Sequence, residues 1–110
     1  MNTFDSLVSD AKNAMDAHDG EALAALFAPD GRVTDENTEH VGRPAIAQWF
    51  RTTPAIRLET VDTTVDGNAY TLIAKGHGDY PNSPLTFRYV FALGNAGISS
   101  LSISLADEAA

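Results

Sequence analysis

Asp35 is the side chain in this sequence best placed to do chemistry. It stands two residues after the apolar Val33, at the end of a short expected strand that follows a tight turn at Asp30-Gly31. A helix is expected to begin near Gly42-Arg43-Pro44, so the carboxylate would project from a strand end into a space walled by helices. A carboxylate sheltered from water has a raised pKa and can abstract a proton next to a carbonyl or activate a water molecule. The alternative is a turn-forming Asp that accepts hydrogen bonds from loop amides.

Three further polar side chains could take part in such a site. Tyr89 lies on a strictly alternating strand, where a buried phenol is either a hydrogen-bond donor in a pocket or a core tyrosine bonded to backbone. His40 follows in an expected loop or hairpin tip and is either an acid–base partner at the substrate or a solvated imidazole. His77 lies between two glycines, which either leave room for a ligand beside the ring or mark a bulge where the sheet bends.

Large aromatic side chains are candidates for the walls of a pocket. Phe27 belongs to an expected second helix, and Trp49 and Phe50 share one stripe of an expected third helix. Such residues either close the core against the sheet or line a cavity, since small-molecule pockets are mainly apolar.

No metal or cofactor is expected. The histidines and acidic residues between positions 35 and 40 and between 77 and 79 lack the spacing of metal ligands. The sequence also lacks a glycine-rich phosphate loop, a serine elbow and a dinucleotide fingerprint.

The elements that must hold these side chains change type near Pro54. Helical spacing predicts a first helix over about residues 3–17, Asp19 can cap a second helix that closes at Pro29, and Pro44 stands in the first turn of a third. Four segments rich in β-branched and aromatic residues follow, separated by turn-forming sequences, and predict strands over residues 55–66, 69–79, 84–94 and 97–105. Because strands joined by short turns pair antiparallel, the chain is expected to form an α+β fold with a curved antiparallel sheet over three N-terminal helices.

The last expected strand leaves its orientation open. Leu101, Ile103 and Leu105 form one face, and serines form most of the other. An outward apolar face would produce a sheet-to-sheet dimer, whereas outward serines would allow a monomer. A one-residue error in register inverts this answer.

Composition limits the classes of function. A chain of 110 residues is expected to form a single domain over residues 1–110, because halves of it would be too small to bury a core. Its net charge of −8, with seven scattered basic residues, argues against a nucleic-acid partner. There are no cysteines, no apolar run long enough to span a membrane and no basic, apolar leader in the first residues, so we expect a cytoplasmic protein without membrane contact.

The order of these elements resembles the nuclear transport factor 2-like superfamily. The resemblance is strongest over Asp19 to Asp35, where a helix precedes a strand bearing an Asp, and over Gly42 to Phe50, which opens with Gly-x-Pro-Ala-Ile. Its small enzyme branch includes ketosteroid isomerases, SnoaL-type polyketide cyclases, limonene epoxide hydrolase and scytalone dehydratase. The resemblance covers essentially the whole chain and implies a cone-shaped, cystatin-like fold around an apolar pocket, with a homodimer formed through the outer face of the sheet.

Within that branch the N-terminal half is similar to ketosteroid isomerase. Residues from Ala11 to Asp35 match it without a gap, which implies that Asp35 occupies the position of the catalytic base. Ala11 falls where that enzyme has its oxyanion tyrosine, and Tyr89 falls, by a looser register, where it has a protonated carboxylic acid. Loss of one oxyanion donor typically lowers a rate on the order of 100- to 1000-fold. Efficient steroid isomerisation is therefore not expected, although Tyr89 or His77 could supply a relocated donor.

Two functions follow from these observations. The first is a cofactor-independent isomerase or cyclase, or a hydratase-type lyase, that acts on a small apolar molecule with Asp35 as general base. The second is a non-catalytic module that binds a ligand or dimerises on the same fold, because a fold does not imply a chemistry.

Overall fold

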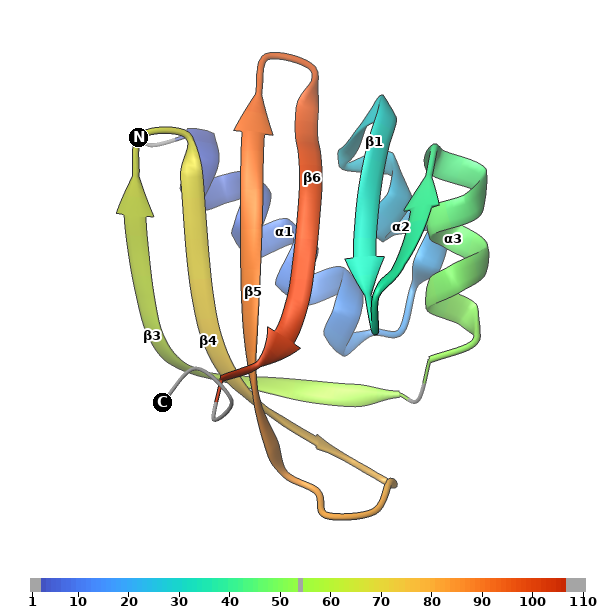
Figure 1. Ribbon diagram of the computed structural model, residues 1–110, viewed down its shortest axis with the longest axis vertical. Coiled ribbons are helices and arrows are strands. Elements are labelled where there is room, and N and C mark those ends of the chain that lie inside the picture. The colour runs from blue at the N-terminus through green and yellow to red at the C-terminus, as the bar shows by residue number, and fades with distance from the viewer. Residues whose placement is uncertain (1–2, 54, 107–110) are drawn as a thin grey trace.

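Three helices lie on one side of a six-stranded sheet in the part of the chain that the computed structural model describes, residues 3–53 and 55–106 (Figure 1). The helices are α1 (Thr3–Asp16), α2 (Gly20–Ala25) and α3 (Arg43–Arg51). In chain order the strands are β1 (Phe27–Asp35), β2 (Thr38–Val41), β3 (Ile56–Asp66), β4 (Ala69–Gly78), β5 (Leu85–Gly94) and β6 (Gly97–Leu105). Their spatial order is β2-β1-β6-β5-β4-β3. This is the α+β architecture that the sequence predicts.

The sheet is mixed rather than purely antiparallel. Strands β3 to β6 pair antiparallel in succession, as the short turns between them predict, and β2 forms an antiparallel hairpin with β1. Strand β1 runs parallel to β6, so the prediction of an antiparallel sheet was wrong for this pair. The two strands are far apart in the chain and no turn joins them, so the local rule for hairpins does not apply.

The register places one row of side chains across the middle of the sheet. Asp35 on β1 is opposite Ile103 on β6, and Ile103 is opposite Tyr89 on β5. Residues opposite one another on neighbouring strands share a face of the sheet. Asp35 and Tyr89 therefore lie on the same face, two strands apart, and their backbones are separated by roughly 9 to 10 Å.

The second helix ends earlier than its sequence suggests. It stops at Ala25, and Phe27 opens β1 instead of closing the helix, so the prediction of a helix up to Pro29 was wrong. The carbonyl of Leu26 accepts a hydrogen bond from the amide of Ile98 at 2.9 Å, which ties this point of the chain to β6. A bond between residues so distant in sequence overrides the local helix preference. The predicted cap at Asp19 is confirmed, since its carboxylate accepts the Ala22 amide at 3.1 Å.

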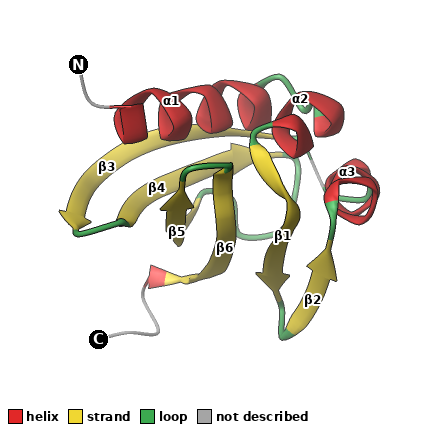
Figure 2. Ribbon diagram, turned by 90° about the horizontal axis from the view of Figure 1, so that it is seen from above, coloured by secondary structure: helices red, strands yellow, loops and turns green. Residues whose placement is uncertain are grey.

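The bulge expected at His77 lies on the neighbouring strand. Arg57 pairs with His77 in regular register, and the register shifts only between Thr60 and Asp62 of β3. Gly76 serves packing instead, because a Cβ there would lie 2.8 Å from the ring of Phe87. Of the two alternatives given for His77, the bulge is therefore wrong, although the sheet does curve, and Figure 2 shows β3 arching beneath α1.

One hydrophobic core fills the space between helices and sheet. Leu101 is fully buried and Ser102 exposed, so the apolar face of β6 points inward and most of its serines point outward. The structure therefore settles which face of β6 points inward, a question that the sequence left open. None of the helices in the described residues is both long and apolar enough to cross a membrane.

Candidate functional site

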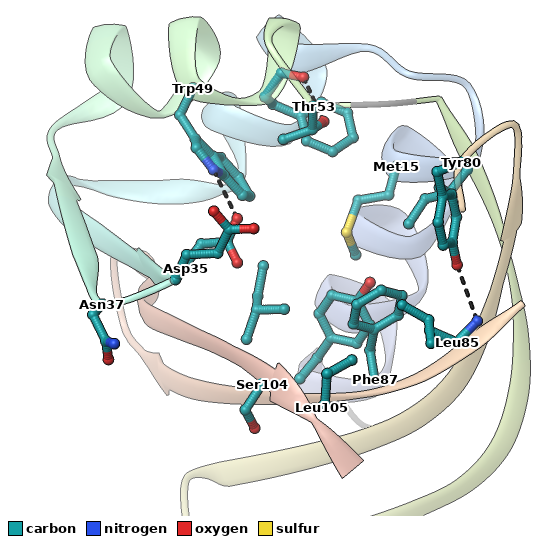
Figure 3. A pocket seen from close by; sticks show the side chains of 15 residues that line it. Met15, Asp35, Asn37, Trp49, Thr53, Tyr80, Leu85, Phe87, Ser104 and Leu105 are labelled. Carbon is teal, nitrogen blue, oxygen red and sulfur yellow. Dashed lines mark hydrogen bonds between the residues drawn. The ribbon is translucent and has the colours of Figure 1, made fainter. Parts of the chain in front are cut away.

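A cavity of about 510 Å³ opens between the helices and the inner face of the sheet (Figure 3). Strands β1, β5 and β6 contribute one wall, and the end of α1, helix α3 and the segment after it contribute the opposite wall. Most of the lining is apolar or aromatic: Met15, Asp35, Glu36, Asn37, Trp49, Phe50, Thr53, Ile56, Tyr80, Leu85, Phe87, Tyr89, Ile103, Ser104 and Leu105. A cavity of this size and character is typical of a small-molecule site.

Asp35 extends into this cavity from the end of β1 and is held there by α3. The indole Nε1–H of Trp49 donates a hydrogen bond to Asp35 Oδ2 at 3.2 Å (Figure 3). Trp49 is itself buried, at 8 % exposed, so the bond joins the carboxylate to a fixed side chain. This hydrogen bond orients the carboxylate, which still borders the open space of the cavity.

Burial raises the pKa of Asp35 above its ordinary value. Loss of solvation is the largest cause, and the neighbouring Glu36 carboxylate adds to it. The Trp49 hydrogen bond, the nearby His40 and the Glu36 backbone act in the opposite direction and lower the pKa. Desolvation outweighs them, which makes the carboxylate a stronger base than an exposed Asp.

Tyr89 is the second polar group inside the cavity. It is 3 % exposed, and no described residue forms a hydrogen bond with its hydroxyl in the structure. Because no buried side-chain N or O atom of the described residues lacks a partner, this hydroxyl must reach the open space of the cavity. Burial, with a smaller contribution from the Asp35 charge, raises the pKa of Tyr89 far above its usual value. The phenol therefore stays protonated and can donate a hydrogen bond.

The other hydrogen-bonding groups in the interior are already occupied. The Tyr80 hydroxyl donates to the Gly76 carbonyl and accepts from the Leu85 amide. The Thr53 hydroxyl donates to the Phe50 carbonyl at 2.7 Å. Figure 3 shows Asn37 and Ser104 pointing away from the centre of the cavity.

Three predicted site residues lie outside the cavity lining. Phe27 is fully buried in the core at the start of β1. His77 forms a hydrogen bond with Glu59 at 2.8 Å, on the part-exposed surface of β3 and β4. His40 lies on β2 with its ring 5.7 Å from that of Trp49, so it contacts the site through Trp49.

The sequence reasoning missed much of the apolar wall. Met15, Ile56, Tyr80 and the strand residues Leu85 and Phe87 line the cavity without having been singled out. The signal for the last two was available, because Leu85 and Phe87 alternate with Tyr89 and must share its face. The others approach from separate elements, and their meeting depends on the curvature of the sheet. Among the described residues no three His, Asp or Glu are close enough to hold a metal ion.

The fold and cavity define the class of protein. A curved sheet closed by helices around one apolar cavity is the architecture of nuclear transport factor 2-like proteins, as the resemblance in sequence implies. Residues 8–94 match the SnoaL-like domain family, and the chain belongs to that family.

Solved structures agree with this assignment. The chain is 32 % identical to a protein of Sinorhizobium meliloti provisionally named a polyketide cyclase, with 94 % of this chain and all of that one covered and a TM-score of 0.83. It is 20 % identical to a Catenulispora acidiphila protein of ketosteroid isomerase-like fold, solved in complex with trimethylamine, with 89 % and 83 % covered and a TM-score of 0.76. It is 17 % identical to SalBIII, an epoxide hydrolase/cyclase-like enzyme of pyran ring formation in salinomycin, with 93 % and 89 % covered and a TM-score of 0.78. No functionally curated protein matches the sequence.

Proposed function

We propose that the protein binds a small apolar carbonyl compound in this cavity and transfers a proton on it, as an isomerase or a cyclase does. The observation that supports the proposal is the row Asp35–Ile103–Tyr89 across three neighbouring strands. It presents a base of raised pKa and a protonated phenol on one apolar face, separated by one aliphatic side chain. A ligand lying over Ile103 would have the base on one side and the donor on the other.

The chemistry follows from these two groups. The Asp35 carboxylate takes a proton from the carbon next to the carbonyl, and the C–H electron pair becomes the double bond of an enolate. The carbonyl oxygen gains the negative charge and accepts a hydrogen bond from Tyr89. Where a C=C bond adjoins that carbon, the product of deprotonation is a dienolate, and return of the proton to its far carbon shifts the double bond and completes an isomerisation. Attack of the enolate carbon on a second carbonyl, followed by protonation of that oxygen, completes a cyclisation.

Hydrogen–deuterium exchange tests the first step without knowledge of the natural substrate. We expect the protein to speed the exchange of α-protons of 2-tetralone in D₂O, followed by NMR. Asp35→Asn removes the base and should lower this rate on the order of 100- to 10,000-fold. Tyr89→Phe keeps the ring and removes the donor, which should lower it about 100- to 1000-fold.

A matched control separates loss of the base from loss of charge. Asp10→Asn removes one exposed carboxylate on α1, away from the cavity, and should leave the exchange rate unchanged. Wild-type exchange in Asp35→Asn would contradict the proposal.

The alternative is a module that binds the same class of molecule without turning it over. The fully buried Ala11, at the position of the oxyanion tyrosine in ketosteroid isomerase, favours it, because the cavity then has one interior donor. Such a module would bind 2-tetralone and shift the Asp35 resonances, but the exchange rate would remain at its background value in every variant.

A further inference from the structure

Among the described residues, the charged side chains that line the cavity are both carboxylates. Asp35 and Glu36 are the charged residues that line it, and the lining holds no Lys, Arg or His. The imidazole of His40 packs against Trp49 but is not part of the lining. Arg32, on the same strand as Asp35, is exposed and forms an ion pair with Glu39 at 3.3 Å. A ligand in the cavity is therefore exposed to two carboxylates and to no compensating cation of the lining.

The uncharged part of the lining is rich in aromatic rings. Trp49 and Phe50 form a tilted pair with centroids 5.6 Å apart, and Phe87 and Tyr89 form another with centroids 6.1 Å apart. Tyr80 adds a fifth ring. The negative face of an aromatic ring attracts cations, and this attraction strengthens where water is excluded.

The hydrogen-bonding groups that remain free in the cavity also favour a cation over an anion. The second oxygen of Asp35 can only accept while it is ionised, and the Tyr89 hydroxyl is the one interior group among the described residues able to donate to a ligand. An anion would meet one donor and two like charges. A cation would meet two opposite charges and several aromatic rings.

We propose that this cavity is also a binding site for apolar ammonium ions, in which the carboxylates of Asp35 and Glu36 balance the positive charge and the aromatic rings surround its alkyl groups. This goes beyond the proton transfer proposed above and does not depend on it. A bound ammonium ion would occupy the carboxylate that proton transfer requires, so these ions are expected to inhibit that reaction.

Three probes of nearly equal shape test the role of charge. Benzyltrimethylammonium is the cation, neopentylbenzene replaces its nitrogen with carbon, and phenylmethanesulfonate is an anion of similar size. Calorimetric titration of the full chain should show the cation binding about tenfold or more tightly than the neutral probe. The anion should bind more weakly than either.

Variants link the preference to the two carboxylates. Asp35→Asn should weaken binding of the cation about tenfold, and Glu36→Gln, which removes an exposed carboxylate at the rim of the cavity, about two- to fivefold. Both should leave the affinity for the neutral probe within about twofold. Asp10→Asn is the matched control, since it removes one charge from an exposed site on α1, and it should leave the affinity for the cation unchanged.

The proposal is overturned if the neutral probe binds as tightly as the cation, if the cation does not bind at millimolar concentration, or if Asp35→Asn keeps wild-type affinity for it. These outcomes differ from failure of the proposed reaction, which shows in the exchange rate of 2-tetralone. A protein that binds the cation and exchanges no protons would support this inference and contradict the reaction.

Discussion

Asp35 combines a functional advantage with a cost in stability. Its carboxylate is partly removed from water and forms no ion pair within the described residues, and desolvation raises its pKa in the folded protein. The folded state therefore holds this proton more tightly than the unfolded chain does. The contribution of the group to the free energy of unfolding is fully present below the unfolded pKa of about 3.9 and is lost as the pH rises through the raised folded pKa.

Asp35→Asn is accordingly expected to stabilise the protein at pH 7. The amide carries no charge to desolvate, and its oxygen can still accept the Trp49 N–H. Urea unfolding between pH 3 and pH 8 should show the variant more stable than the wild type at neutral pH, with the difference closing as the pH falls toward 3.9.

Trp49→Phe tests the second influence on the Asp35 pKa, the hydrogen bond from the indole. It removes a hydrogen bond that lowers the Asp35 pKa, so the carboxyl resonance of Asp35 should titrate at a higher pH than in the wild type.

A stability difference for Asp35→Asn that stayed constant across the pH range would show that Asp35 has its ordinary pKa in the folded state.

At the scale of elements, local sequence patterns predicted those helices and strands whose bounds are set by neighbouring residues. The helix at Arg43–Arg51 with Pro44 in its first turn and the four long strands follow from caps, turns and alternation. The early end of α2 and the parallel pairing of β1 with β6 depend on bonds between distant residues, such as Ile98 to Leu26. A single sequence carries no direct signal for those bonds.

The same distinction applies to the candidate site. Asp35 was recognised from its strand end and Trp49 and Phe50 from a helical stripe, but their meeting with Tyr89 required the register of three strands. Phe27 was expected on a helix that reaches Pro29, but it opens β1 and is buried in the core.

Substitution of Gly76 tests whether the packing of the sheet sets the position of a ring that lines the cavity. Its missing side chain leaves room for the ring of Phe87, which lines the cavity. Gly76→Ala should push this ring inward, lower the stability by about 1–3 kcal/mol and weaken binding of the neutral probe. Urea unfolding and calorimetric titration measure the two effects.

Gly94→Ala is the control for Gly76. Its Cβ would meet one carbonyl oxygen at an ordinary contact distance of 3.8 Å. If both variants lost the same stability, the effect would come from glycine flexibility rather than from the contact with Phe87.

At the scale of the whole molecule, the outer face of the sheet differs from the rest of the surface. Alternation along the strands directs Arg32, Arg57, Lys75 and Arg88 to the face opposite the helices, although the chain has a net charge of −8. The half-buried side chains Ile73 and Val90 lie among them on neighbouring strands. The same alternation places the acidic residues Glu39, Glu59, Asp62 and Asp66 on this face, so its charges are close to balanced. A surface with apolar residues at its centre and balanced charge is suited to self-association of an acidic protein.

We therefore expect a homodimer formed through this face, whose stable form requires about 800 Å² of buried surface on each partner. Light scattering after size exclusion should give twice the monomer mass for the wild type. Val90→Glu places an unpaired charge at the centre of the contact and should raise the dimer dissociation constant roughly 30-fold or more. Val65→Glu adds the same charge at a half-exposed position whose alternation places it on the face that bears the helices, and it should leave the dimer intact. A monomeric wild type, or equal effects of the two variants, would show that the outer face does not mediate association.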